Sequence, residues 1–179
     1  MALYQILLVV HVLDVFGMAV LLGMLVTCLW RTYDSGTVKD LRRWAGFAKK
    51  LNTYANLSLA VLFLTGLYLA MIEKNWDQAW IKIAPVFILL MGGILGGVVS
   101  SWLRKIKKEL APSPAELTPT LQALLTKSAP WIFSQVLLGL FLGAIILMVL
   151  QPEIGISVLI LAISLAGGGT LGFMTKIRK

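Results

Sequence analysis

Charged and reactive side chains are scarce in this chain of 179 residues. Asp, Glu, Lys and Arg make up 13% of the sequence, and there is one histidine, His11, and one cysteine, Cys28. Soluble domains average about 25% charged residues, so an ordinary soluble enzyme is excluded. One cysteine excludes both an intramolecular disulfide and a paired-cysteine metal site. The sequence also lacks a Ser-His-Asp set, a zincin helix, a carboxylate pair and a glycine-rich nucleotide loop, which favours a protein without hydrolytic activity.

Long apolar runs take the place of the missing charge. Apolar residues make up 59% of the chain, and five runs are each long enough to cross a hydrocarbon core about 30 Å thick. The runs predict transmembrane helices at residues 3–30, 54–72, 81–103, 131–150 and 154–173. An amphipathic stretch from near Thr37 extends the second helix backwards. We therefore expect an all-α, polytopic membrane protein with one domain of five transmembrane helices.

The first run predicts a retained helix. It has no basic residue before its apolar core and no small-residue cleavage site, so a signal peptide is not indicated. The basic residues then give the orientation, because all except Lys74 and Lys82 follow the first run, the third run or the fifth. Short loops rich in Lys and Arg stay in the cytoplasm, which predicts an external N-terminus and a cytoplasmic C-terminus. Tyr33, Trp102 and Trp131 are expected at the inner interface.

The net charge of +8 is explained by this topology and is not evidence for nucleic acid. The lipid bilayer is the main expected partner. The longest cytoplasmic loop, 104–130, has a capping box at residues 113–116 and a second helix start at Thr118-Pro119. We expect a short helix here on the membrane surface, with its leucines in the interface.

Glycines recur at four-residue spacing in the last three runs. They form the pairs Gly92 and Gly96, Gly139 and Gly143, and Gly168 and Gly172. Glycines four apart share a helical face and let two backbones approach closely, so a glycine-packed bundle is predicted. The same faces could also form a homo-oligomer, bind the helices of a membrane partner subunit, or leave room for a flat ligand.

Two ionisable residues, His11 and Asp14, lie inside the first predicted span. They share one helical face, with His11 about 12 Å and Asp14 about 16 Å below the outer edge. Burying a charged aspartate at a helix centre costs roughly 2.5–3.5 kcal/mol on insertion scales, so both residues are functional candidates. They could form hydrogen bonds that set the register of the bundle, or relay protons or cations. Alternatively His11 is a ligand to haem or copper, with Asp14 as its supporting group.

The ligand hypothesis needs a second donor besides His11. A bis-histidine haem would require a second subunit, whereas a His/Met haem or a Cu(I) site would use a thioether. Met91 lies nearest to the level of His11, and Met18 follows on the face of His11 and Asp14. The candidate cofactor-binding residues are therefore His11, Asp14, Met18 and Met91, although methionines are also common packing residues.

Several short motifs resemble a known family. They are His11-Val12-Leu13, Gly17, Gly23, Thr65-Gly66-Leu67, Trp80-Ile81, Leu103-Arg104, Leu147-Met148-Val149 and Pro152. Over residues 3–152 the chain resembles a family of small integral membrane proteins of unknown function, distantly similar to the copper-resistance D membrane domain. The resemblance implies a protein of the cytoplasmic membrane of a bacterial-type cell whose span-one histidine, here His11, binds a metal or haem. The chain departs from the family pattern at Gln151, where a lysine is expected, and at Asp14.

Three functions follow as hypotheses. The first is a membrane protein that binds haem or copper through His11, in redox or metal handling. The second is an accessory or scaffold subunit of a membrane complex with no chemistry of its own. The third is a small proton-coupled transporter that uses Asp14. This third hypothesis is weaker than the others because the five spans show no inverted repeat, which many transporters have.

Overall fold

The computed structural model of this chain describes residues 2–73, 76–112 and 115–175. Within these residues helices joined by short connections account for the fold, and there are no strands. The elements are α1 (Ala2–Tyr33), α2 (Val38–Glu73), α3 (Ala79–Gly92), the π-helix η1 (Gly93–Val99), α4 (Ser100–Leu110), α5 (Pro119–Leu125), α6 (Ala129–Leu150) and α7 (Ile154–Met174). Lys74, the first half of the expected capping box and the basic residues after Thr175 lie outside the described residues.

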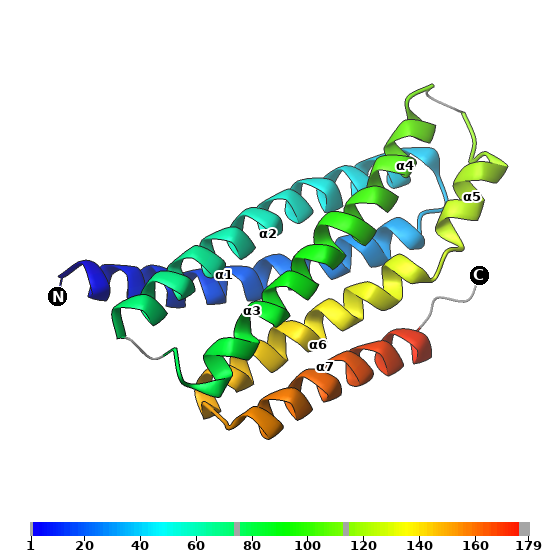
Figure 1. Ribbon diagram of the computed structural model, residues 1–179. Helices are drawn as coiled ribbons and strands as arrows, with labels where there is room; N and C mark the ends of the chain where they lie inside the picture. The colour runs from blue at the N-terminus through cyan, green and yellow to red at the C-terminus, as the bar shows by residue number, and fades with distance from the viewer. Residues whose placement is uncertain (1, 74–75, 113–114, 176–179) are drawn as a thin grey trace.

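Five helical segments are long and apolar enough to cross a membrane, which confirms the predicted number of spans. The third is the continuous segment Ala79–Leu110, formed by α3, η1 and α4 together. α2 includes the amphipathic stretch because Thr37 caps its start, accepting a 3.1 Å hydrogen bond from the Asp40 N–H. Since the number of spans is odd, the first turn of α1 and the last turn of α7 lie at opposite ends of the bundle (Figure 1).

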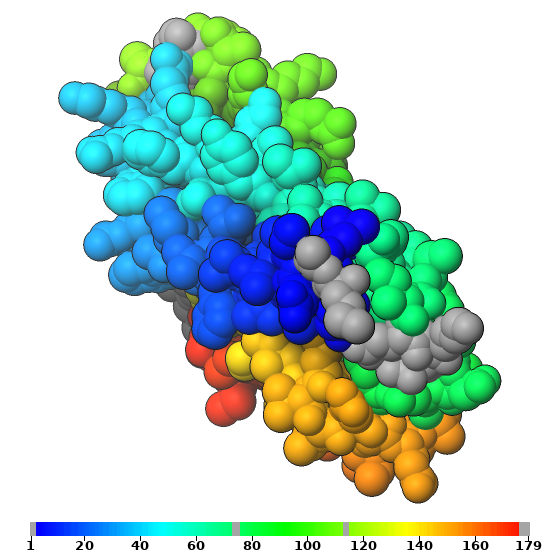
Figure 2. Space-filling view, turned by 90° about the vertical axis from the view of Figure 1, so that its left-hand side faces the viewer, coloured from blue at the N-terminus to red at the C-terminus, as the bar shows by residue number. Residues whose placement is uncertain are grey.

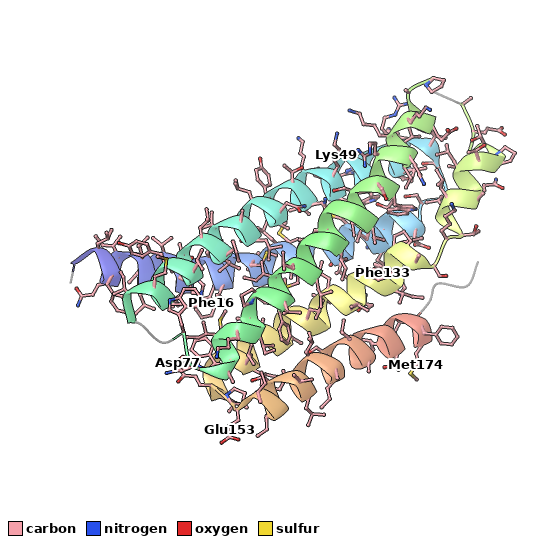
Figure 3. The ribbon with its side chains drawn as sticks, viewed as in Figure 1. Phe16, Lys49, Asp77, Phe133, Glu153 and Met174 are labelled. Atoms are coloured by element: carbon pink, nitrogen blue, oxygen red, sulfur yellow. The ribbon has the colours of Figure 1, made fainter. Side chains whose placement is uncertain are left out.

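The two ends of the bundle differ in charge. We call the end where α1 begins the N-terminal end, and the end where α1 stops the basic end. Apart from Lys82, every described lysine and arginine lies at the basic end, in α1, α2, α4 or the connection before α6. Figure 3 shows Lys49 at this end and the acidic Asp77 and Glu153 at the other. Between the two ends the described helices have no lysine or arginine, and Asp14 of α1 is half-buried against α2, as the cost of placing charge in hydrocarbon requires.

The core is built on the antiparallel pair α1 and α2, which contact each other along their length. Leu22, Leu25 and Leu29 are fully buried at spacings of three and four, so they form one face of α1. α2 contributes Leu41 and Ala48 to the same hydrophobic core, and both are also fully buried.

α7 packs against α6 through small residues. Its buried residues are Ser157, Ser164, Gly168 and Gly172. An added Cβ would lie 2.5 Å from Val136 Cα at Gly168 and 2.8 Å from Ile132 Cα at Gly172. Real Cβ atoms do not come so close to a neighbouring backbone, so neither position has room for a side chain.

The glycines of α6 make the same contact from the other side. A Cβ at Gly139 would lie 2.5 Å from Ser164 O, and one at Gly143 would overlap Ser164 Oγ. Gly92 and Gly96 differ, because a Cβ there would lie 3.6 Å from Leu59 and 3.8 Å from Asn56, which is ordinary contact. The closest backbone approach in the described bundle therefore involves α6 and α7, and α3 with η1 is packed less tightly against α2.

The π-helix Gly93–Val99 interrupts the third span. Its wider turn leaves Leu95 O accessible to side chains, and Ser100 Oγ and Asn52 Nδ2 donate to it at 2.8 and 3.3 Å. Asn52 Nδ2 also donates to Ser100 Oγ at 2.7 Å. Four glycines at positions 92, 93, 96 and 97 weaken the α-helical preference here, so polar contacts from α2 and α4 can stabilise the π-helical turn.

α5 forms where its start signal predicts, but its leucines do not face a membrane interface. Thr118 Oγ1 accepts from the Leu121 N–H at 3.3 Å and caps the helix. Leu121, Leu124 and Leu125 are buried in the protein core, and Trp102 Nε1 donates to Leu124 O at 3.0 Å. The seven-residue helix thus gains more by covering the end of α4 than by entering lipid.

An aromatic cluster at the basic end also differs from the expected interfacial belt. Tyr33 stacks on Trp102 with ring centroids 4.8 Å apart and meets the edge of Trp131 at 6.2 Å. All three side chains are buried, and Tyr33 Oη donates to Lys127 O at 2.9 Å. These rings join α1, α4 and α6, because their aromatic contact area is worth more inside the bundle than at its surface.

Gly168→Ala tests the close contact between α6 and α7. The new methyl group would meet the Val136 backbone, so we expect the free energy of unfolding to fall by roughly 1–3 kcal/mol in detergent. The matched control is Gly167→Ala, where a Cβ meets nothing within 4 Å. This control should be neutral or slightly stabilising in the same thermal-unfolding measurement, and equal loss in both variants would contradict the contact.

Candidate functional site

His11 is held by a residue of α2. Its Nδ1 lies 2.7 Å from Thr65 Oγ1, and Thr65 Oγ1 lies 2.7 Å from Val61 O in its own helix. A threonine hydroxyl has one proton, so both contacts are satisfied when Thr65 donates to Val61 O and accepts from the His11 Nδ1–H. This places the proton on Nδ1 and leaves a lone pair on Nε2. Among the described residues, none hydrogen-bonds to Nε2.

Gly66 leaves the space that the imidazole ring occupies. An added Cβ at Gly66 would lie 3.3 Å from His11 Cε1, so even a methyl group would press on the ring. Thr65 and Gly66 therefore act on the same side chain, since one fixes its tautomer and the other makes room for it. Two adjacent residues of α2 thus set the position of His11.

His11 lines an apolar cavity of about 500 Å³ at the N-terminal end of the bundle. The cavity lies between α1, α2, α3 and α6, and Gly66, Pro85 and Trp80 are among its lining residues. Figure 2 shows this end of the molecule, with the first turns of α1 beside α2 and α3 and above the connection between α6 and α7. A volume of this size falls within the range of about 300–1,000 Å³ found for small-molecule sites.

The methionines near His11 are arranged differently from the sequence expectation. Met18 and Met91 are buried in the core, with 0% and 2% of their surfaces exposed, and neither lines the cavity. Met148 of α6 does line it. If the helices are taken as straight, Met148 lies nearer to the outer surface than His11. The cavity nevertheless extends far enough along the bundle for both residues to line it. Met148 is therefore the thioether that shares a cavity with His11.

Asp14 makes a separate contact with α2. Ser58 Oγ donates to Asp14 Oδ1 at 2.6 Å, whereas Asp14 Oδ2 is buried and has no hydrogen-bond partner within the described structure. In those same residues, no hydrogen bond or ion pair joins His11 to Asp14. Each residue is instead joined to a hydroxyl of α2, and together the two bonds fix how α1 and α2 are aligned.

A third polar contact continues along the same helix. Asn52 of α2 donates to Leu95 O of the π-helix, while its own Oδ1 is buried and unpartnered within the described residues. Thr65 and Ser58 are seven residues apart, close to two helical turns, so both face α1. Asn52, six residues before Ser58, is turned by roughly 120° from that face and contacts the third span. The hydrogen-bonding groups of α2 thus extend from the N-terminal end to the middle of the bundle and serve two neighbours.

The metal-ligating side chains near His11 limit which cofactors could bind in the cavity. No group of three or more His, Cys, Asp or Glu side chains that could hold a metal ion occurs in the described part of the chain. The cavity lining contains one imidazole and one thioether, His11 and Met148, besides the oxygen groups of Tyr4 and Gln151. The imidazole and the thioether match the axial ligands of a His/Met haem and the soft donors that Cu(I) prefers.

The sequence predicts His11 and Asp14 as site residues but does not identify Thr65 and Ser58 as their partners. Thr65 enters only within the motif Thr65-Gly66-Leu67. A usable signal was present, because the connection between α1 and α2 is short and Asp14 and Ser58 are almost equally distant from it along the chain. Equal distance from a short turn means similar depth in an antiparallel helix pair.

Comparison with protein-family models, with curated proteins and with solved structures found no match to this chain. The resemblance to a copper-resistance D-like family therefore stays a prediction. The residues and distances described above are the basis on which a function can be argued.

Thr65→Val tests the bond to His11. The substitution keeps the shape of the side chain but removes the acceptor of the Nδ1–H, so we expect a loss of about 1 kcal/mol in the free energy of unfolding. The control is Thr27→Val on α1, an exposed position where Oγ1 donates only to Gly23 O in its own helix. Equal unfolding midpoints for the two variants would show that the His11 bond does not stabilise the fold.

Proposed function

We propose that this chain is a multi-pass membrane protein that binds haem, or else copper, through Nε2 of His11, in redox or metal handling. The observation that carries the proposal is the contact between His11 Nδ1 and Thr65 Oγ1. A histidine that ligates a metal usually donates its other ring N–H to an oxygen, which fixes the tautomer and orients the free nitrogen. His11 has this arrangement and lines a cavity large enough for a ligand.

The size and lining of the cavity favour haem over a single copper ion. An ion would fill a small part of about 500 Å³, and compact copper sites gather more donors than one imidazole and one thioether. A flat apolar group would use more of the cavity, and His11 with Met148 would be the residues that hold it. When bound, such a group would supply one-electron exchange.

The orientation and assembly belong to the same proposal. The excess of lysine and arginine at the basic end favours a cytoplasmic location for that end and an external N-terminus. The cavity with His11 would then open toward the external half of the cytoplasmic membrane. Glycine-mediated packing is supported by the contacts of Gly139 and Gly168, whereas the outer faces of Gly93 and Gly97 meet nothing within 4 Å and could receive a second copy or a partner subunit.

The test is an absorption spectrum with metal analysis of the protein purified in mild detergent from haem- and copper-replete cells. We expect a Soret band, or one copper per chain, and at least tenfold lower occupancy in His11→Ala. Thr65→Val should weaken binding by roughly 10- to 100-fold, because it removes the group that orients the imidazole.

The matched control is Leu13→Ala, two residues from His11 but 64% exposed and outside the cavity lining. This variant should keep the full spectrum. A colourless, metal-free wild-type protein would contradict cofactor binding, and so would a His11→Ala variant with the wild-type spectrum. A colourless protein that co-purifies with a stoichiometric membrane partner would instead support the accessory-subunit hypothesis.

A second candidate function is favoured by Asp14. Its Oδ2 is buried in the middle of the first span without a hydrogen-bond partner within the described structure, and Ser58 occupies only the other oxygen. A carboxylate in this situation can take up a proton or accept a cation. The row of polar groups from Thr65 to Asn52 would continue such a path toward the middle of the bundle.

Proton flux into liposomes tests this candidate. If Asp14 relays protons, Asp14→Asn should reduce the flux at least tenfold, because the amide cannot exchange a proton at this site. Asp34→Asn is the control, since Asp34 lies in the connection after α1 and outside the spans. Equal flux through the wild type and Asp14→Asn would dispose of the relay.

A further inference from the structure

A second cavity, of about 550 Å³, lies at the basic end between α2 and α4. Four of its lining residues are cations, and the remainder are apolar or small. The lining residues are Arg42, Ala45, Gly46, Lys49, Lys50, Thr53, Leu103, Lys107, Leu110 and Ala111. We call this the α2–α4 groove. No carboxylate is among its lining residues, so its field is positive and attracts an anion.

The packing of the two helices shapes the groove. Gly46 leaves it open, because a Cβ at this position would meet nothing within 4 Å. Arg42 reaches across the end of the groove and donates to Leu110 O at 3.1 Å. Lys49 and Lys107 lie on opposite helices with exposed side chains. Cations from both helices therefore face one opening, unlike the scattered lysines elsewhere on α4.

The groove lies at the level where headgroups are expected. It extends along α2 from Arg42 to Thr53, and the apolar run of this span starts one residue later. Tyr54 and Leu57, the next outward-facing residues, are 57% and 63% exposed. Apolar side chains that face lipid thus continue directly from the charged opening. A ligand with an anionic head and a long apolar tail would match both parts.

We propose that the α2–α4 groove binds the headgroup of an anionic phospholipid. The phosphate takes its place between Lys49, Lys50 and Lys107, and the acyl chains run beside Tyr54 and Leu57. Basic pockets between transmembrane helices at the cytoplasmic side are suited to such headgroups. The binding stabilises the contact between α2 and α4, and it is independent of any cofactor at His11.

The experiment measures lipid binding to the full-length protein in detergent by native mass spectrometry. Phosphatidylglycerol is titrated against phosphatidylcholine with the same acyl chains. We expect one phosphatidylglycerol molecule bound per chain at concentrations where phosphatidylcholine is not retained. The double variant that combines Lys49→Gln and Lys107→Gln should bind phosphatidylglycerol about 25-fold more weakly, which is about fivefold for each lysine removed.

The matched control is Lys105→Gln with Lys108→Gln, which removes the same charge from exposed positions of α4 outside the groove lining. It should change the affinity less than twofold. Gly46→Leu is the complementary variant, because it fills the open groove and keeps every charge, and it should abolish retention of phosphatidylglycerol. Thermal unfolding of each variant shows that the fold is kept.

Any of the following four results would contradict the proposed lipid site. Equal weakening by the two lysine pairs would mean attraction by overall charge, without a site. Unchanged binding in Gly46→Leu would place the lipid elsewhere. Displacement of the lipid by millimolar inorganic phosphate or glycerol phosphate would identify the ligand as a soluble anion. Equal retention of phosphatidylcholine would remove the role of the four cations.

Discussion

Polar groups inside a hydrocarbon layer must find their partners within the protein, and this requirement organises the bundle. Three such groups on α2, Thr65, Ser58 and Asn52, hold His11, Asp14 and the carbonyl of Leu95. Each bond is favourable because both partners would otherwise lie unsatisfied in an apolar environment. Thr65 and Ser58 join α2 to α1, and Asn52 joins α2 to the third span. The position of His11 follows from this arrangement.

Two kinds of helix contact divide the bundle. α1 and α2 are joined by hydrogen bonds and by a shared hydrophobic core, whereas α6 and α7 approach until their backbones touch at Gly139 and Gly168. The third span lies between these pairs and contacts both. Residues of α1, α2, α3 and α6 surround the apolar cavity at the N-terminal end, beside the imidazole ring that Gly66 accommodates. The cavity is thus a consequence of how two tightly packed pairs meet.

The two cavities differ in the charge of their lining residues. The cavity at the N-terminal end is apolar and has one imidazole, so it suits an apolar cofactor whose metal is bound by a histidine. The α2–α4 groove has four cations and continues into apolar surface, so it suits an anionic lipid. One helix, α2, lines both. A change in the position of α2 would therefore alter both cavities together.

The sequence alone determined the five spans, the uneven distribution of charge, and His11 and Asp14 as the ionisable residues within a span. Composition and run length are sufficient for this, because hydrocarbon excludes charge wherever a helix crosses it. Only the tertiary structure decided that Thr65 and Ser58 are the partners, that Met148 and not Met18 or Met91 shares a cavity with His11, and that the leucines of α5 are buried. The rotation of each helix about its axis decides these contacts. That rotation depends on side chains from several helices at once, so no single apolar run specifies it.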